Sequence, residues 1–185
     1  MKKISVIIIA LLVCLCANGQ SKGHMSFMGI PMGISISSFQ TKLAAKGVKY
    51  DPMSRHLEDA VRLYNGKFAG YQAAIFVYYD IKSHLVYRAK VCVERGDKSL
   101  ADNVFFELLE MLVKKYGYDN VYKNSSEDDT DYSISVEIDE GRIDMYEVQN
   151  NADYFEHYDD YYIVHIDYFD AAAQVQNIKS RMEDL

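Results

Sequence analysis

Apolar and polar positions alternate along residues 85–94, and this period of two predicts a β-strand. The predicted apolar side consists of Leu85, Tyr87, Ala89, Val91 and Val93, and the opposite side carries Arg88, Lys90 and Glu94. Such a strand is buried on one face and solvated on the other. Further strands are predicted over residues 60–68 and 71–81, joined by short polar turns. Residues 60–94 therefore predict a three-stranded antiparallel meander.

The same alternation returns in the second half of the chain. Residues 132–138 alternate apolar with polar side chains, and Glu140 and Gly141 predict a hairpin turn into a strand over residues 142–149. A further strand is predicted over residues 161–169. The connections over residues 118–131 and 150–160 are polar and acidic and are interpreted as loops.

Three helices are predicted from apolar positions spaced three or four residues apart. The first follows Ser35 or Ser37 as cap, the second is capped by Ser99 and stops at Gly117, and the third covers residues 171–185. The third helix has one apolar side, made of Val175, Ile178, Met182 and Leu185. Residues 20–33 are interpreted as an extended lead-in, because Pro31 and several glycines interrupt any regular pattern.

The predicted fold class is α+β, with a mostly antiparallel sheet of about six strands, arranged as two three-stranded meanders, and with the helices packed on one face. The two halves share an order of elements but no residue-level similarity, so an internal duplication is only suggested.

The first nineteen residues predict a secretory signal peptide. Lys2 and Lys3 precede an apolar run over residues 4–16, and small residues follow at 17–19. The run is short for an ordinary membrane span. Residues 20–185 are then expected to form one exported domain, periplasmic, surface-associated or secreted, with no stable membrane span. A retained N-terminal anchor and a lipoprotein signal are the alternatives.

Charge is distributed unevenly along the chain. Residues 20–120 contain 14 Lys and Arg against 10 Asp and Glu, whereas residues 121–185 contain 4 against 17. A strongly acidic half argues against nucleic acid and anionic lipid as ligands. It is compatible with a basic protein partner, with a divalent cation and with plain solubility. Cys92 is the one cysteine outside the signal region, so it is expected to be an inert buried thiol without a disulfide partner.

Several short motifs resemble a family of small exported proteins of unknown function from Gram-negative anaerobes. These motifs are the segments 27–33, 35–39, 66–70 and 113–117. The order of elements is also similar to β-lactamase-inhibitor-protein-like domains and to small lipoproteins of outer-membrane assembly. Those proteins are binding modules, which implies binding rather than catalysis. Neither resemblance supplies a catalytic residue.

The sequence contains no recognisable catalytic, phosphate-binding or metal-binding motif. The five histidines do not form pairs with metal-ligand spacing, and no cofactor is predicted. An enzyme would need dispersed residues, such as His165 beside Asp167 or Asp170.

The remaining candidate is an acidic, tyrosine-rich run near the end of the chain. Its predicted binding residues are Tyr154, Tyr158, Asp159, Asp160, Tyr161 and Tyr162. Tyrosines are enriched at protein interfaces, and carboxylates suit a basic surface. The first hypothesis is therefore a non-catalytic protein-interaction module with a basic partner. The alternatives are a binder of glycans or another small extracellular ligand, and then an enzyme with dispersed residues. Weak calcium binding to the acidic loops is a further open possibility.

Overall fold

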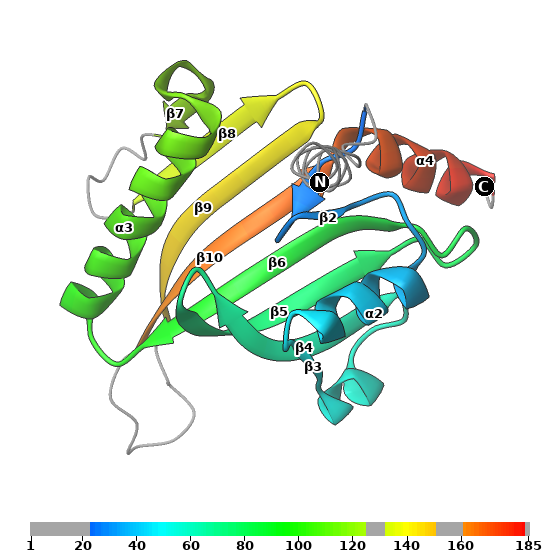
Figure 1. Cartoon of the computed structure of the whole chain (residues 1–185), viewed down its shortest axis with the longest axis horizontal. Helices are drawn as coiled ribbons and strands as arrows, with labels where there is room; N and C mark the ends of the chain where they lie inside the picture. Colours follow the sequence, from blue (N-terminus) through cyan, green and yellow to red (C-terminus); the bar gives the residue numbers. More distant parts are fainter. Residues whose placement is uncertain (1–22, 125–131, 151–160, 184–185) are drawn as a thin grey trace, which may run out of the picture.

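The computed structural model describes residues 23–124, 132–150 and 161–183 (Figure 1). The predicted signal peptide and most of the acidic tyrosine-rich run therefore lie outside the described residues.

Eight strands form one antiparallel sheet in the order β3-β4-β5-β6-β10-β9-β8-β7. The first half of the chain supplies α2 (Ile36–Ala45), β3 (Lys49–Tyr50), β4 (Val61–Phe68), β5 (Tyr71–Tyr79) and β6 (Val86–Arg95). The second half supplies α3 (Lys98–Tyr116), β7 (Val121–Lys123), β8 (Ser133–Ile138), β9 (Gly141–Asn150) and β10 (Tyr161–Asp170). Both halves thus repeat a helix followed by four strands, and they join where β6 pairs with β10.

The remaining elements are short strands and helices at the ends and connections. A separate two-stranded sheet contains β1 (Ser26–Phe27) and β2 (Ile30–Pro31), and the chain continues from β10 into α4 (Ala171–Met182). Two 3₁₀ turns cover Pro52–His56 and Tyr118–Asn120. None of the helices in the described part of the chain has the length and apolar composition of a membrane span.

The α+β class and the mostly antiparallel sheet are confirmed, but the expected number of strands is wrong. The described residues form ten strands rather than about six. The two meanders are each extended by a short edge strand, β3 and β7, of two and three residues. Both lie in polar stretches, where the sequence shows no alternation to reveal them. Their position at the edges of the sheet explains this, because an edge strand needs little apolar surface.

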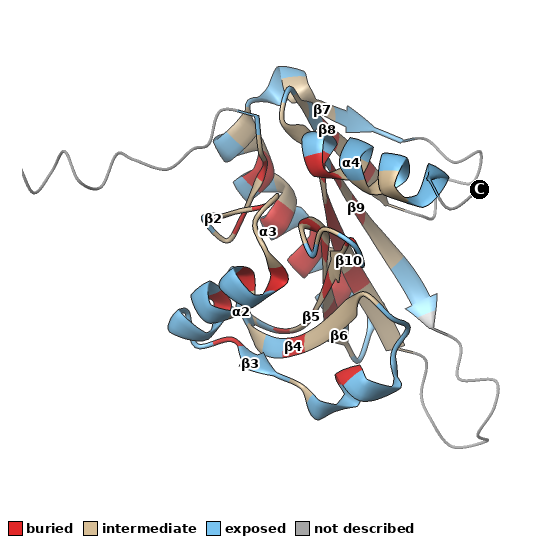
Figure 2. Ribbon diagram, turned by 90° about the vertical axis from the view of Figure 1, so that its right-hand side faces the viewer, coloured by how far each residue is buried: buried red, intermediate tan, exposed pale blue. Residues whose placement is uncertain are grey.

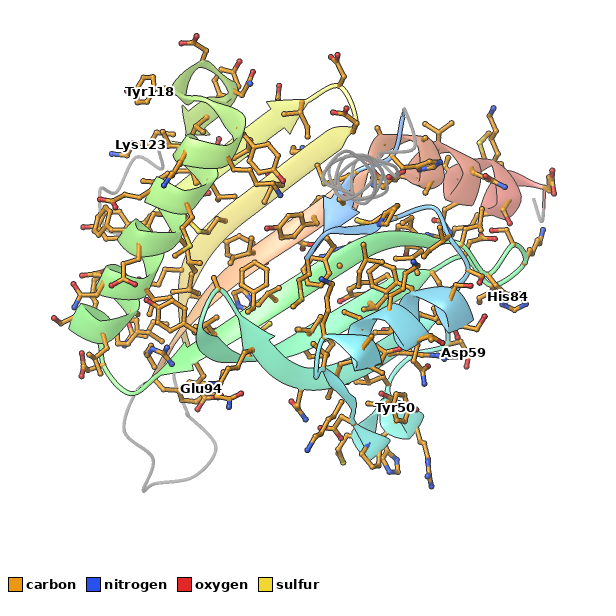
Figure 3. The ribbon with its side chains drawn as sticks, in the orientation of Figure 1. Tyr50, Asp59, His84, Glu94, Tyr118 and Lys123 are labelled. Atoms are coloured by element: carbon orange, nitrogen blue, oxygen red, sulfur yellow. The ribbon has the colours of Figure 1, made fainter. Side chains whose placement is uncertain are left out.

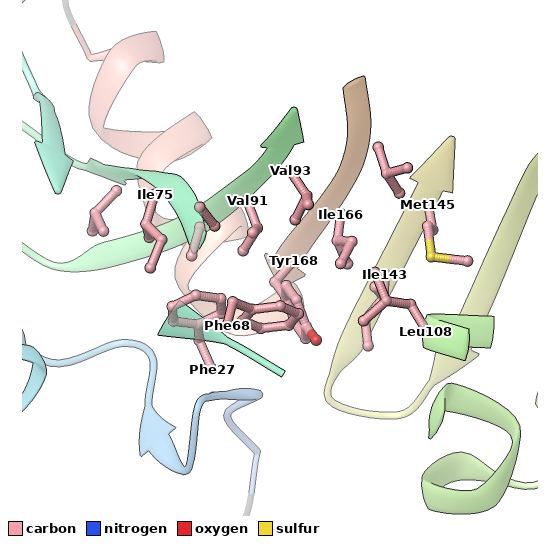
Figure 4. Close-up of a cluster of buried hydrophobic side chains, with 14 of the residues drawn as sticks. Phe27, Phe68, Ile75, Val91, Val93, Leu108, Ile143, Met145, Ile166 and Tyr168 are labelled. Carbon is pink, nitrogen blue, oxygen red and sulfur yellow. The ribbon is translucent and has the colours of Figure 1, made fainter. Parts of the chain in front are cut away.

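The segment interpreted as an extended lead-in is a hairpin in the centre of the molecule. Met28 and Gly29 both have positive φ angles, 51° and 72°, as a two-residue hairpin turn requires. On either side of this turn, Met25, Phe27, Ile30 and Met32 are buried. Phe27 packs against the rings of Phe68 and Tyr168 (Figure 4) and against the ring of Phe39. The N-terminal hairpin therefore completes the core between α2 and α3.

Helices α2 and α3 cover one face of the sheet, which we call the inner face. Ile36, Phe39 and Leu43 of α2 are buried, and so are five residues of α3, namely Ala101, Val104, Phe105, Leu108 and Leu112. They pack against inward-facing strand residues such as Val91, Ile143 and Ile166 (Figure 4). The apolar stripes predicted for these two helices therefore account for the inner core.

Helix α4 lies on the other side of the sheet, so the expectation that the helices pack on one face is wrong. Figure 2 shows α2 and β2 on one side and α4 on the opposite side. The position of α4 follows from polar contacts: Asn177 donates a hydrogen bond to Asp80 at 3.0 Å, and Lys82 donates one to the carbonyl of Ser180 at 2.8 Å. Asp80 and Lys82 both belong to the turn between β5 and β6, whereas Asn177 and Ser180 belong to α4. Hydrogen bonds to this turn, rather than an apolar stripe, hold the helix.

One predicted strand face also needs correction. The pairing of β5 with β6 shifts between Tyr78 and Tyr79, so that Tyr79 faces Val86 and Tyr78 faces Arg88. Tyr87 is the extra residue of this bulge, and bulges reverse the alternation of side chains. Val86, not Leu85 or Tyr87, therefore shares the inner face with Ala89, and Tyr87 lies on the outer face with Arg88.

The helix caps were partly predicted. Ser35 caps α2, as one of the two expected serines, by accepting a hydrogen bond from the amide of Ser38. The cap of α3 is Asp97, which accepts from the amide of Leu100 at 2.8 Å, and not Ser99. The helix begins two residues earlier than the prediction.

Candidate functional site

The sheet face opposite α2 and α3, which we call the outer face, is covered only by α4 among the described elements. The strand registers place one set of side chains on it: Leu63, Phe76, Tyr78, Arg88, Lys90, Cys92, Tyr146, Val148, Ile163, His165 and Asp167. Asp167 is buried, Val148 is exposed, and the others are partly buried. The outer face is thus a mixed aromatic, aliphatic and charged surface.

An arginine–aspartate pair organises the part of the outer face beside α4. The Arg88 guanidinium donates to both carboxylate oxygens of Asp167, with Nε lying 2.8 Å from Oδ1. The same guanidinium lies 4.5 Å from the ring centre of Tyr78 and 5.0 Å from that of Phe169. Bidentate pairing and ring contacts hold Arg88 rigidly. Its charge is balanced by Asp167, so this cluster is a structural centre and not an anion site.

A second cluster lies on the outer face at the middle of β6, β9 and β10. His165 stacks on Tyr146 with 4.9 Å between ring centres, and its Nδ1 lies 3.2 Å from the Cys92 sulfur. The ammonium of Lys90 lies 5.6 Å from the centre of the Tyr146 ring. The register explains these contacts, because Cys92 and Tyr146 both lie directly opposite His165 on the strands that flank it.

The cysteine–histidine contact is not an activated nucleophile. Burial raises the pKa of the Cys92 thiol to about 11. Burial, together with the positive charge of Lys90, lowers the pKa of His165 to about 4. At neutral pH both groups are uncharged, whereas a catalytic cysteine needs a thiolate. Asp167 pairs with Arg88 and Asp170 with His24, at 3.0 Å, so neither carboxylate orients His165. The expected example of dispersed catalytic residues, His165 beside Asp167 or Asp170, is therefore not assembled in the described structure.

The neutral state of His165 predicts an acid-sensitive fold. The pKa of this group is lower in the folded chain than the ordinary value of 6.5, so the unfolded state binds the extra proton. Stability from this group is present above pH 6.5 and is lost as the pH falls toward 4. Because the side chain is only partly buried, the expected loss is about 1–2 kcal/mol, less than a full desolvation would give.

Urea unfolding at pH 4.5 and pH 7 measures this loss, with His165→Gln as the comparison. The variant should show a smaller difference between the two pH values than the native protein. Equal pH dependence of both proteins would mean that His165 is not the group responsible.

Helix α4 exposes its apolar side to solvent. Val175, Ile178 and Met182, which we call the α4 stripe, are 52%, 51% and 64% exposed. The side of the helix that faces the protein is polar apart from the buried Ala173, and Asn177 on that side bonds to Asp80. Amphipathic helices normally bury the apolar side. The arrangement in α4 is reversed, and an apolar stripe left in water indicates a surface used for contact.

An open groove of about 490 Å³ separates α4 from the ends of β4, β5 and β6. Its lining includes Tyr78, Tyr87 and the carboxylates of Asp59 and Asp80. Figure 3 shows Asp59 near His84 of the β5–β6 turn, with Tyr118 and Lys123 beside the opposite edge of the sheet. A groove lined by tyrosines and carboxylates has the chemistry that a sugar ligand uses, namely stacking surfaces and hydrogen-bond acceptors.

The six residues predicted as a binding site are mostly outside the described residues. This applies to Tyr154, Tyr158, Asp159 and Asp160. The other two begin β10 and point to opposite faces of the sheet, because neighbouring strand residues alternate. Tyr161 lies on the outer face, whereas Tyr162 packs against the inner core. The structure therefore does not bring Tyr161 and Tyr162 together.

Most of the Asp and Glu side chains that the structure describes within residues 121–185 form ion pairs. Asp144 pairs with Arg142 at 2.9 Å, Glu147 with Lys98 at 3.1 Å, and Asp167 with Arg88. Eight other carboxylates belong to residues 127–131 and 153–160, which are outside the described residues. The strand ends that flank both segments lie toward one end of the sheet: Asn124 bonds to Ser133, Ser133 faces Tyr146 in the second half of β9, and Asn150 at the end of β9 faces Tyr161.

No protein-family model, no curated protein and no solved structure matches this chain. Within the described ranges, no three or more of His, Cys, Asp and Glu lie close enough together to hold a metal ion.

The sequence shows the apolar side of α4 but not whether that side faces the sheet or the solvent. Two features indicate that the polar side of α4 faces the protein. They are the polar residues Asn177 and Ser180 on that side, and the buried carboxylate of Asp80 in the β5–β6 turn, which needs hydrogen-bond donors. The outer-face pair of Tyr146 and His165 was also missed, although alternation from the buried Met145 and Ile166 places both residues on one face.

Proposed function

We propose that this protein is an exported, non-catalytic binding module that recognises a protein partner through the outer side of its C-terminal half. The α4 stripe is the observation that carries the proposal. Its three side chains remain more than half exposed, although the helix has an equally long polar side that could have faced water instead. Burying three such side chains against a partner would contribute a few kcal/mol of binding free energy, roughly 1.5–3 for each complete burial.

The outer face continues this surface away from α4. Phe76, Tyr146 and Ile163 lie on it, partly exposed, between the α4 end and the end where residues 151–160 begin. Aromatic side chains held in fixed positions lose little entropy on binding, which suits an interface. The partner that fits combines an apolar patch for the α4 stripe with a basic segment for the acidic sequence of residues 121–185.

A pull-down with three baits tests this function. Tagged residues 20–185 are exposed to envelope and growth-medium proteins of the source organism, beside a Val175→Ser/Ile178→Ser/Met182→Ser variant and an Asp159→Asn/Asp160→Asn variant. The native bait should retain a protein that both variants retain at least several-fold less. At high salt the native bait should retain no more of the partner than the asparagine variant does. The reason is that the screening length, about 8–10 Å at physiological ionic strength, becomes shorter as salt is added, so the carboxylates no longer attract the partner.

The matched control is Met53→Ser/Leu57→Ser, which removes two exposed apolar side chains elsewhere on the surface. Exposed substitutions of this kind change stability by about 0.5 kcal/mol or less, so far-ultraviolet circular dichroism should show all four baits folded. A partner retained equally by all four baits would refute the proposed surface.

Glycan binding is the second candidate, favoured by the groove lined by Tyr78, Tyr87 and Asp59. It is distinguished in the same experiment by analysing the eluates for carbohydrate. A glycan retained by the native bait and by the α4-stripe variant, without any protein, would support this candidate over the first.

A further inference from the structure

A second hollow lies on the inner side of the molecule, away from α4 and the outer face. This inner groove has a volume of about 440 Å³ and runs between α3, the β4–β5 turn and the β1–β2 turn. Its walls are mostly apolar and well buried: Leu108 and Leu112 come from α3, Phe68 from β4, and Ile166 and Tyr168 from β10. The volume is that of an ordinary small-ligand pocket, for which about 300–1,000 Å³ is usual.

The hydroxyl group of Tyr168 is an unpartnered donor in this apolar groove. The side chain is only 6% exposed, and Figure 4 shows its oxygen directed away from the sheet. Within the described ranges, no residue forms a hydrogen bond with this hydroxyl; its ring neighbours are Phe27 and Phe68. Tyr64, the other tyrosine that is almost completely buried, places its hydroxyl 3.4 Å from Gln40. The fully buried unpaired polar atoms of the described residues are Glu147 Oε2 and Ser180 Oγ, so the unpaired Tyr168 hydroxyl is open to the groove and can donate to a ligand there.

The Tyr168 hydroxyl can act as a donor throughout the ordinary pH range. Burial raises its pKa far above the ordinary value of 10, so the proton stays on the oxygen. A protonated phenol donates to an acceptor such as a carboxylate oxygen. The preferred ligand atom at this point is therefore an oxygen acceptor.

Two lysines also line the inner groove, one from each helix of the inner face. Lys46 follows the last residue of α2, and Lys115 lies in the last turn of α3. Neither forms an ion pair with a described carboxylate. Positive charge at a helix C-terminus is explained by the helix dipole alone. The helix dipole does not explain why lysines from two helices line the same groove as the unpaired Tyr168 hydroxyl.

We propose that the inner groove binds a medium-chain fatty acid. The alkyl chain lies against Leu108, Leu112 and Ile166, and the carboxylate accepts a hydrogen bond from Tyr168 and is attracted by Lys46 and Lys115. This inference is independent of the proposed protein partner, because the α4 stripe and the inner groove lie on opposite sides of the sheet.

Isothermal titration of residues 20–185 with sodium decanoate, below its micelle concentration, tests the proposal. Neutral decanol and cationic decyltrimethylammonium are titrated in parallel and should bind at least tenfold more weakly than decanoate. Tyr168→Phe removes only the hydroxyl group and should weaken decanoate binding about tenfold, the loss expected for one hydrogen bond to a charged group. Lys46→Gln/Lys115→Gln should also weaken it several-fold.

The matched control is Lys42→Gln/Lys114→Gln, which makes the same charge change on the same two helices at residues that do not line the inner groove. It should bind decanoate like the native protein, and so should the α4-stripe variant. Unfolding of the free proteins supplies a second readout. Because the Tyr168 hydroxyl has no partner to lose, the urea midpoint of Tyr168→Phe should equal or exceed that of the native protein.

The proposal is overturned if decanoate gives no binding heat, if decanol binds as tightly, or if Tyr168→Phe leaves the affinity unchanged. A clear fall in the urea midpoint of Tyr168→Phe would also overturn it, since the hydroxyl would then have a partner within the chain. Co-sedimentation with phosphatidylglycerol vesicles separates the sources of such a ligand. Binding to vesicles without binding to decanoate would indicate a membrane surface and would exclude the free fatty acid.

Discussion

Replacing Phe27 by alanine is expected to lower the free energy of unfolding by about 3–5 kcal/mol, the usual cost of truncating a buried phenylalanine. Phe27 is completely buried, and its ring lies 5.2 Å from that of Tyr168, 5.9 Å from that of Phe68 and 6.3 Å from that of Phe39. These residues come from the N-terminal hairpin, β10, β4 and α2. The substitution would therefore leave a cavity at the point where both halves of the chain meet.

Urea unfolding followed by far-ultraviolet circular dichroism measures this loss. Tyr118→Ala is the control, because Tyr118 is 80% exposed and its truncation should change stability by about 0.5 kcal/mol or less. A Phe27→Ala variant as stable as the control would show that the N-terminal hairpin does not complete the core.

Replacing Asp170 by alanine is expected to cost about 2–5 kcal/mol of unfolding free energy, because one carboxylate satisfies several buried donors. The side chain is completely buried and accepts hydrogen bonds from the amides of Met25 and Ala173, both at 2.7 Å. It also accepts one from Nδ1 of His24, at 3.0 Å. The carboxylate thus caps α4 and fastens the N-terminal hairpin to the end of β10.

The matched control for this second prediction is Asp97→Ala. Asp97 also caps a helix through an aspartate side chain, but it is exposed and satisfies a single amide, that of Leu100. Its loss should cost about 1 kcal/mol, the typical value of a cap. The difference between the two losses of unfolding free energy measures the contribution of the hydrogen bonds from Met25 and His24 to Asp170. Equal losses would show that these hydrogen bonds do not stabilise the fold.

The candidate site was less predictable than the fold, and the α4 stripe illustrates why. A sequence shows that Val175, Ile178 and Met182 share one side of a helix, but the direction of that side depends on what the rest of the helix contacts. Here the decisive contact joins Asn177 to Asp80, residues almost a hundred positions apart. The inner groove was equally hidden, because its lining is drawn from both helices and from strands of both halves.

Local pattern alone was sufficient for the six long strands and three helices. The strands predicted from alternation or from the turns between them, β4, β5, β6, β8, β9 and β10, lie within about two residues of their observed bounds, and alternation marks β6 and β8 because a strand buried on one face must alternate whatever it packs against. Apolar spacing of three and four does the same for α2 and α3.

Only the tertiary structure decided the position of the N-terminal hairpin, the two short edge strands, the bulge at Tyr87 and the side of the sheet on which α4 lies. The N-terminal hairpin has its own alternation, with Met25, Phe27, Ile30 and Met32 around a two-residue turn, but a methionine with a positive φ angle conceals the turn. The physical reason is common to all four features. Each is set by hydrogen bonds and packing against another segment of the chain, and a local pattern of hydrophobicity carries no information about which segment that will be or in what register it pairs.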